Sequence, residues 1–297
     1  MSEFHVTFRS YYLSGTINIT IITPNAIDQG EVEAYYNADR EFPVLWMLHG
    51  GYGTFADWAT YNTVPRYAIE RNCIMVAPSA PNSDFCNRPD VGEGYYFEDF
   101  FIKELVPLVR KWFHGSSDPE KNLISGNSMG CAATWRYGLL YPEIFGYLGP
   151  LCNQPLNYNF LEPYRDLTSA QFRALAQRER IPTAYGIDSG SIHEKELNNV
   201  CAYASVGDFL DSIENTWVRF DEAAVANKLP KIFISGALEK KWGPMMGIFK
   251  GHCEDLEIKN ITFDMYDQPT HNSPFWEQSV ERFMEFAGLR KAEHFLV

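Results

Sequence analysis

Short apolar runs that stop at a turn residue constrain the fold of this chain more than any other feature. Five runs show no regular alternation of polar and apolar residues, and 261–266 is expected to form a sixth strand. The five lie at 44–48, 74–77, 123–125, 147–151 and 231–235. Runs of this kind are typical of strands that are buried on both faces, as in a parallel sheet.

Helical patterns lie between these runs. Segment 97–113 repeats apolar residues at i, i+3 and i+4, and Pro107 inside it predicts a kink or an early stop. Segments 129–140 and 274–286 are two further predicted helices. The repeated order strand, helix, strand predicts an α/β fold with a right-handed, mostly parallel sheet.

Two parts of the chain depart from this rhythm. Segments 6–12 and 16–21 are rich in β-branched and aromatic residues and predict an N-terminal antiparallel hairpin. Residues 152–230 begin as a polar loop and continue with two helical stretches. We interpret them as a cap or lid over the carboxyl edge of the sheet, where ligands bind, within a single domain spanning 1–297. A surface insertion without function is the alternative, because long insertions cost little stability.

Composition excludes several classes of protein. The chain has 297 residues, enough to bury a large core without disulfides or a structural metal. Asp and Glu number 38 against 25 Lys and Arg, so the net charge is −13. This balance gives no basic surface for nucleic acid and little attraction to an anionic membrane. We therefore expect neither among its partners.

The cysteines and the N-terminus bear on the compartment. None of the six cysteines forms a C-x-x-C pair, so they are interpreted as reduced core residues. The first residues lack the charged and apolar regions of a signal peptide, and no apolar run approaches the roughly 20 residues of a membrane span. We predict a cytoplasmic protein.

The motif G-x-S-x-G occurs at 126–130. Segment 123–125 before it is strand-like, and 131–136 after it is helical. This is the strand, turn and helix of a nucleophile elbow, which predicts Ser128 as a nucleophile. An ordinary glycine-rich turn between a strand and a helix is the alternative.

A second glycine-rich segment, 49–53, follows the first buried run. At this position α/β-hydrolases supply an oxyanion N–H, and acyl transfer needs such donors at the developing negative charge. We assign the backbone amides of Met129 and Gly51, with Tyr52 as the alternative to Gly51. A phosphate-binding loop is disfavoured, because no Lys follows and no G-x-G-x-x-G is present.

A serine nucleophile needs a base and an acid. His271 follows the last predicted strand, where the hydrolase order Ser, acid, His has its base. Glu239 follows the 231–235 run and is our candidate for the acid that orients the imidazole. Asp264, Asp267 and Asp188 are its rivals.

These residues together resemble the esterase D-like α/β-hydrolases, most closely the branch of tributyrin and feruloyl esterases. The matching stretches are 43–51, 96–100, 124–130, 145–150, 270–272 and Trp276. The resemblance implies the α/β-hydrolase fold, with Ser128 as nucleophile, His271 as base and an acid in the loop after Gly236. The family usually has Asp where Glu239 falls, and other residues where Asn127 and Cys131 stand.

The sequence therefore predicts a serine carboxylesterase that works through an acyl-enzyme on Ser128. Feruloyl or acetyl esters of carbohydrates are the candidate substrates. A non-catalytic binding protein on the same fold, suggested by Asn127, Cys131 and Glu239, and an acyltransferase are the alternatives. The mechanism requires no cofactor and no metal. The expected partner is a small-molecule ester, and the sequence leaves the acyl group, the alcohol and the oligomeric state open.

Overall fold

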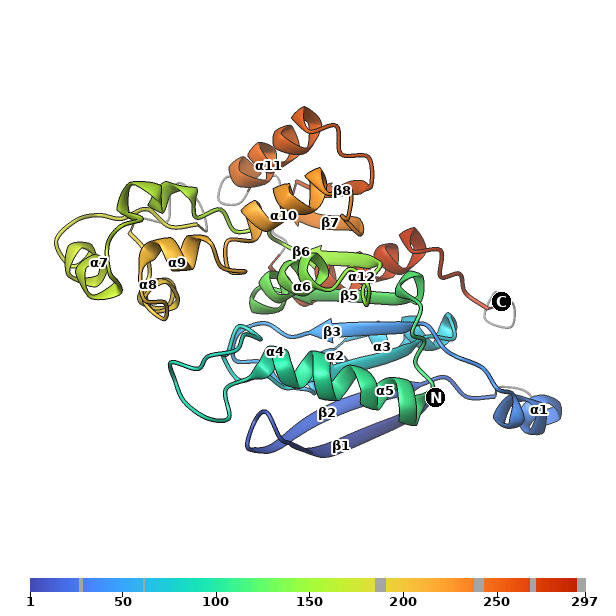
Figure 1. Cartoon of the computed structure of the whole chain (residues 1–297). Helices are drawn as coiled ribbons and strands as arrows, with labels where there is room; N and C mark the ends of the chain where they lie inside the picture. Colours follow the sequence, from blue (N-terminus) through green and yellow to red (C-terminus); the bar gives the residue numbers. More distant parts are fainter. Residues whose placement is uncertain (27–28, 61, 185–190, 238–242, 268–270, 293–297) are drawn as a thin grey trace.

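An eight-stranded sheet forms the centre of the computed structural model (Figure 1). The structure describes residues 1–297 except 27–28, 61, 185–190, 238–242, 268–270 and 293–297. The strand order is β1-β2-β4-β3-β5-β6-β7-β8. The strands are β1 Ser2–Ser10, β2 Gly15–Thr23, β3 Val44–Leu48, β4 Ile74–Pro78, β5 Asn122–Asn127, β6 Tyr147–Leu151, β7 Lys231–Ala237 and β8 Ile261–Tyr266.

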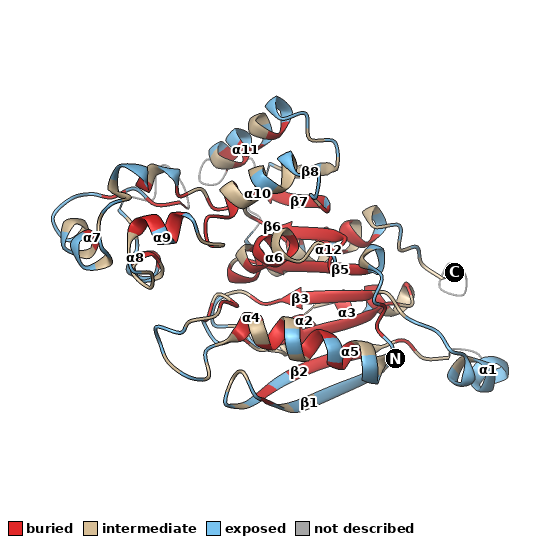
Figure 2. Cartoon of the chain, viewed as in Figure 1, coloured by how far each residue is buried: buried red, intermediate tan, exposed pale blue. Residues whose placement is uncertain are grey.

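The sheet is mostly parallel, as the sequence predicts. β1 pairs antiparallel with β2, and β2 pairs antiparallel with β4. The other neighbouring strands are parallel. Every residue of β3, β4, β5 and β6 is buried, which explains why their sequences do not alternate (Figure 2).

Helices cover both faces of this sheet and bury a separate apolar cluster on each. One face carries α4 Phe97–Asp99, η2 Phe100–Leu105, α5 Val106–Phe113, α6 Met129–Leu140, α10 Thr216–Val225 and α11 Gly243–Asp255. The other carries α2 Asp57–Thr60, α3 Val64–Glu70 and α12 Ser273–Phe286. Side chains of β3 alternate between the two clusters, with Trp46 in the first and Met47 in the second. The described helices include none that combines the length and apolar character needed to cross a membrane.

The predicted helix at 97–113 forms, and it does not stop at Pro107. Segment η2 is π-helical, and Pro107 falls in the first turn of α5 that follows. Proline has no amide to donate, and Pro107 comes directly after the π-helical turn, where the amide of Val106 donates to the carbonyl oxygen of Phe101. The early stop was therefore wrong, and a local change of helix type takes its place.

Apart from Cys152, which packs in the cluster beneath α12, residues 152–230 divide between two apolar clusters. The part from Leu156 to Leu210 forms a third cluster, separate from those of the sheet. It contains η4 Asn159–Tyr164, α7 Ser169–Ala176, α8 Glu194–Val200 and α9 Val206–Leu210. Figure 1 shows α7, α8 and α9 beyond the strand ends, on the side to which β3 points. Trp217 and Phe220 of α10, in contrast, belong to the core of the sheet.

The remaining described helices are short. They are η1 Gln29–Glu31, α1 Val32–Asn37 and η3 Pro119–Lys121. None of them has a buried residue, and α1 stands apart from the sheet at the edge opposite α7 (Figures 1 and 2).

Candidate active site

Ser128 lies in the sharp turn between β5 and α6. Its φ of 51° and ψ of −113° form a conformation that costs a residue with a side chain about 1–3 kcal/mol. Its carbonyl oxygen accepts from the amides of Cys131 and Ala132 at 3.0 and 3.3 Å. Its side chain makes no capping hydrogen bond to the helix and is half-buried. The hydroxyl is therefore not used to hold the helix, as a nucleophile elbow requires.

Gly126 and Gly130 let this turn pack closely against β3. A Cβ on Gly130 would lie 2.2 Å from the carbonyl oxygen of Leu48, and a Cβ on Gly126 would lie 2.7 Å from it. The obstructing atoms belong to the backbone, which cannot turn aside as a flexible side chain can. The glycines of the motif are thus required by the approach of α6 to the end of β3.

The loop that follows β3 lies against the serine. A Cβ on Gly50 would be 3.4 Å from Ser128 Cβ and 2.9 Å from Asn127 Nδ2. At such distances the main chain of the loop borders the serine side chain. The structure thus brings together the two segments predicted to supply oxyanion amides, the loop after β3 and the start of α6 at Met129.

The geometry of this loop bears on the choice between Gly51 and Tyr52. The amide of Gly53 donates to the carbonyl oxygen of Gly50 at 3.1 Å and closes a tight turn. Tyr52 has a φ of 63° in this turn, and its amide donates to Asn82 Oδ1 at 2.9 Å. The Tyr52 amide is therefore engaged, which favours Gly51 as the donor.

His49 supports the loop from the buried side and is 1% exposed. Its Nε2 accepts from the amide of Ala80 at 2.9 Å, and its Nδ1 lies 2.7 Å from the carbonyl oxygen of Gly50. A carbonyl oxygen can only accept, so Nδ1 carries the proton and the ring is neutral. Burial lowers the pKa of this imidazole, in agreement with a neutral ring. His49 therefore fixes the position of the loop.

His271 lies between β8 and α12 and is exposed. Its ring is 5.2 Å from the ring of Trp276 and almost perpendicular to it. Asn272 caps α12 by accepting from the amide of Phe275 at 3.0 Å. Trp276 donates from Nε1 to Cys152 Sγ at 3.0 Å. A helix cap and an anchored indole thus fix the chain next to His271.

A small pocket of about 160 Å³ lies between the elbow and the start of α12. Its walls are Asp57, Trp58, Asn62, Asn127, Ser273 and Trp276. Asn127 directly precedes Ser128, and Ser273 follows His271 by two positions. The pocket therefore borders both segments that carry the predicted nucleophile and base.

The predicted acid, Glu239, and its rival Asp188 lie outside the described residues. Asp264 is engaged: its Oδ2 accepts from Arg282 at 2.9 Å, and both of its oxygens accept from Tyr266 at 3.0 Å. Asp267 is exposed and directly follows β8. The contacts of Asp264 thus disfavour one of the three rivals.

Two further residues at the site are absent from the sequence prediction. Asn82 positions the loop from 30 residues away, and Trp58 lines the pocket. The turn dipeptide that contains Asn82 gives no indication of its distant partner. Cys131 stands where the resembling family usually has another residue. It is fully buried with Sγ 3.4 Å from the carbonyl oxygen of Asn153, and burial raises the pKa of its thiol, so it is a core residue.

Known protein families include one that matches this chain over much of its length. The esterase family described as "Putative esterase" matches residues 29–208, more than half of the chain. An acetyl esterase from Caldicellulosiruptor saccharolyticus is 28% identical over 146 residues, which are 49% of this chain and 53% of that protein. The chain thus spans about half the length of this curated relative.

Solved structures resemble nearly the whole chain. Fluorophosphonate-binding serine hydrolase F of Staphylococcus aureus has a TM-score of 0.70 at 18% identity, covering 96% of this chain and 98% of its own. An S-formylglutathione hydrolase of the same organism gives 0.68 at 18% identity, with coverages of 96% and 98%. A ferulic acid esterase gives 0.65 at 18% identity, with coverages of 96% and 97%. The predicted α/β-hydrolase fold is confirmed.

Proposed function

Because this chain belongs to the esterase family that matches residues 29–208, we propose that it is a serine carboxylesterase. The predicted resemblance to esterases is confirmed by this membership. One observation at Ser128 carries the proposal. Its backbone is strained, its side chain makes no capping hydrogen bond to α6, and the backbone of Gly50 lies against it. Strain at a residue that makes no structural use of its side chain is typical of a functional position.

In the proposed reaction, Ser128 Oγ attacks the ester carbonyl carbon while His271 takes its proton. The amides of Met129 and Gly51 donate to the oxyanion of the tetrahedral intermediate. The intermediate collapses, His271 protonates the leaving alcohol, and an acyl-enzyme forms on Ser128. Water then attacks the acyl carbonyl with His271 as base, which releases the acid and restores the serine.

We propose Glu239 as the acid that holds the imidazole of His271. β7 and β8 are parallel neighbours, and Ala237 pairs with Tyr266 at their ends. The chain therefore leaves the same edge of the sheet toward Glu239 and toward His271. Glu239→Gln is expected to lower kcat by about 10⁴-fold through loss of the required tautomer. Asp267→Asn is the matched control and is expected to leave kcat unchanged. If Asp267→Asn lowers kcat and Glu239→Gln does not, Asp267 is the acid.

The pocket beside the elbow favours a short acyl group. Its volume of about 160 Å³ is close to that of an engineered cavity of about 150 Å³ that binds benzene. An acetyl group fills much of such a space, whereas most of a feruloyl group, with its ring, propenoyl arm and methoxy group, would extend beyond the pocket and lose contact with its walls. We therefore propose acetyl or other short-chain esters ahead of feruloyl esters. Higher kcat/KM for methyl ferulate than for p-nitrophenyl acetate would contradict this order.

We also propose that 152–230 forms a cap within a single domain and contributes to the alcohol side of the site. The separate apolar cluster from Leu156 to Leu210, beyond the strand ends, supports this role. Replacement of 159–210 by a glycine–serine linker is expected to preserve hydrolysis of p-nitrophenyl acetate and to raise KM for acetylated oligosaccharides. Equal KM values for both proteins would contradict a role in substrate binding.

For the compartment, we propose the cytoplasm. The six cysteines, all within the described residues, form no disulfide with one another, which suits a reducing environment. Alkylation of the protein inside intact cells, followed by mass spectrometry, is expected to count six reduced thiols. Detection of a disulfide would contradict the proposal.

The test of the esterase proposal is covalent labelling with a fluorophosphonate probe. The wild-type protein is expected to gain the mass of the probe at Ser128, and Ser128→Ala is expected to gain none. Hydrolysis of p-nitrophenyl acetate, with free acetate as product, then separates esterase from acyltransferase when acceptor alcohols are added. Labelling of neither protein would favour a non-catalytic binding protein.

A further inference from the structure

Strand β1 forms one edge of the sheet and is open along its length. Within the described residues, β1 pairs with β2 and with no other strand, so about half of its main-chain amides and carbonyl groups point away from the sheet. Figure 1 shows β1 as the outermost strand, and Figure 2 shows that it is largely exposed. Such an edge can accept a further strand, because its unpaired hydrogen-bonding groups are already aligned.

The features that usually protect an edge strand are missing from β1. The strand contains no proline and no lysine, and no bulge interrupts its nine-residue register with β2. Both of its ends are fixed, because Ser2 Oγ donates to Asn25 at 3.0 Å and Ser10 Oγ donates to Glu104 at 2.5 Å. The strand therefore needs little ordering before it pairs.

The sequence of β1 is complementary to itself when two copies run in opposite directions. An antiparallel pair centred on Val6 places Glu3 opposite Arg9 of the second copy and, by symmetry, Arg9 opposite Glu3. The same register places Phe4 opposite Phe8 on both sides of the centre. Opposite charges and aromatic rings that face each other across neighbouring strands both stabilise a sheet.

Other registers lose these contacts. A centre at His5 places Glu3 opposite Thr7, and a centre at Thr7 places Arg9 opposite His5. A shift by a single position would turn the second copy over, so that its charged face adjoins the apolar face of the first. The register centred on Val6 therefore pairs the opposite charges and uses every residue of the strand.

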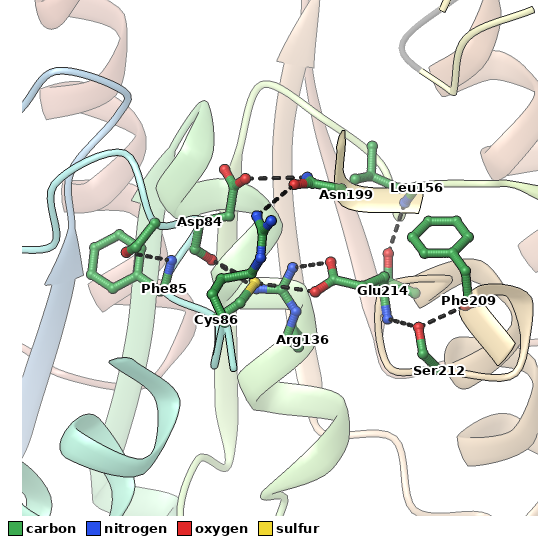
Figure 3. Close-up of polar contacts among 12 residues, drawn as sticks. Asp84, Phe85, Cys86, Arg136, Leu156, Asn199, Phe209, Ser212 and Glu214 are labelled. Carbon is green, nitrogen blue, oxygen red and sulfur yellow. Dashed lines mark hydrogen bonds and ion pairs between the residues drawn. The ribbon is translucent and has the colours of Figure 1, made fainter. Parts of the chain in front are cut away.

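Arg9 has no carboxylate partner within the described part of its own chain. The residue is exposed, and the β2 residues opposite Glu3 and Arg9 carry no charge. Glu3 contacts an exposed imidazole, that of His5, at 3.1 Å. The buried Arg136, in contrast, donates to Glu214 at 2.6 Å (Figure 3). The guanidinium of Arg9 is thus available to a carboxylate of a second copy.

Phe4 adds an apolar contact to this edge. Its side chain is 42% exposed, although its ring lies 5.3 Å from the ring of Phe113. Phe8 is half-buried and packs against the core of the sheet. In the register centred on Val6, Phe8 of the second copy covers part of Phe4, which removes apolar surface from water.

We propose that two copies of this chain associate through β1, in an antiparallel pair centred on Val6. The two eight-stranded sheets then form one continuous sheet across a twofold axis. An interface confined to one strand of each copy favours a reversible dimer over a permanent one. Three strands separate β1 from β5, which leads to Ser128, so the association is independent of the proposed esterase activity.

The test is sedimentation equilibrium of the full chain over a range of concentrations. The wild type is expected to approach twice the monomer mass of 34.1 kDa as its concentration rises. Arg9→Glu and Glu3→Arg are each expected to raise the dissociation constant about tenfold or more, because both ion pairs become pairs of like charges. Lys228→Glu is the matched control: Lys228 is exposed and follows α10, away from β1, so the dissociation constant is expected to stay unchanged.

A mixture of the two charge variants separates strand pairing from damage to the fold. When Arg9→Glu and Glu3→Arg proteins are mixed in equal amounts, both ion pairs form again between unlike copies. A heterodimer about as stable as the wild-type dimer is therefore expected. A mixture that associates no more tightly than either variant alone would overturn the proposal, as would a dimer that neither substitution weakens. A wild type that is monomeric at every concentration would also overturn it and would leave the edge to a strand of another protein.

Discussion

The beginning and the middle of helix α6 are held in place by opposite means. At its beginning, the chain around Ser128 packs through glycines, and main-chain atoms approach each other without side chains between them. About two turns later, Arg136 is 2% exposed and depends on a charged partner, Glu214, at 2.6 Å. One region excludes side chains, whereas the other buries two opposite charges.

The two regions respond differently to substitution. Backbone atoms around the elbow lie so close together that an added side-chain atom would distort the turn. The region around the Arg136–Glu214 pair loses stability when the carboxylate is removed, because the buried guanidinium then has no partner to offset the cost of its desolvation. We therefore expect catalytic activity to depend most on the beginning of α6 and stability to depend most on its middle.

Ser128→Ala gives the largest expected effect and concerns activity alone. We expect kcat for p-nitrophenyl acetate to fall by at least about 10⁴-fold, since removal of a nucleophile from a triad has an effect of this order. The free energy of unfolding in urea is expected to stay unchanged, because the Ser128 side chain makes no cap to α6. A large loss of stability would contradict this prediction, because the serine would then have a structural role.

Glu214→Gln gives the complementary effect on stability. We expect the free energy of unfolding in urea to fall by about 3–5 kcal/mol, because Arg136 remains charged and buried without its carboxylate. Asp211→Asn is the matched control: it removes a carboxylate from the exposed pair with Arg165, for which a loss of about 1 kcal/mol or less is expected.

A double variant distinguishes the effect of charge from the effect of packing at this pair. Arg136→Met combined with Glu214→Leu removes both charges and is expected to recover most of the lost stability, because neither desolvation cost remains. If the double variant is as unstable as Glu214→Gln, the stability of this region depends on the packing of the two side chains and not on their charges.

The same contrast explains which parts of the molecule the sequence could predict. The helix at 129–140 and the elbow were predicted with the observed bounds, because the glycine spacing of the motif and the composition of the segment after it are short-range signals. The pairing of Arg136 with Glu214 joins residues 78 positions apart, and nothing local to either residue indicates the other. Asn82 escaped prediction for the same reason. The short polar helix α8 was also missed, because it has too few apolar residues to show a period.

Gly130→Ala tests the close packing of the elbow. Its Cβ would meet the Leu48 carbonyl oxygen at 2.2 Å, so we expect a loss of about 1–3 kcal/mol in urea unfolding. A shift of the serine by about 1 Å is expected to lower kcat about 100-fold as well. Gly247→Ala is the matched control: it lies in α11 with no atom within 4 Å, and it should stabilise the protein by about 0.5–1 kcal/mol. Equal changes in stability and kcat for the two substitutions would show that the close approach of α6 to β3 does not restrict the residue at position 130.

The smallest expected effect is a pH dependence that originates at His49. Burial lowers the pKa of His49 in the folded protein below its ordinary value of 6.5. Between these two values the unfolded chain binds the additional proton, so the free energy of unfolding decreases as pH falls below 6.5, by at most about 1.4 kcal/mol per pH unit. Urea unfolding of wild type and His49→Gln between pH 5 and 7.5 isolates this contribution, because the carboxyl groups are common to both proteins. The stability difference between them is expected to narrow as pH falls, and a constant difference would mean that His49 keeps its ordinary pKa and that the glycine loop does not depend on a neutral ring.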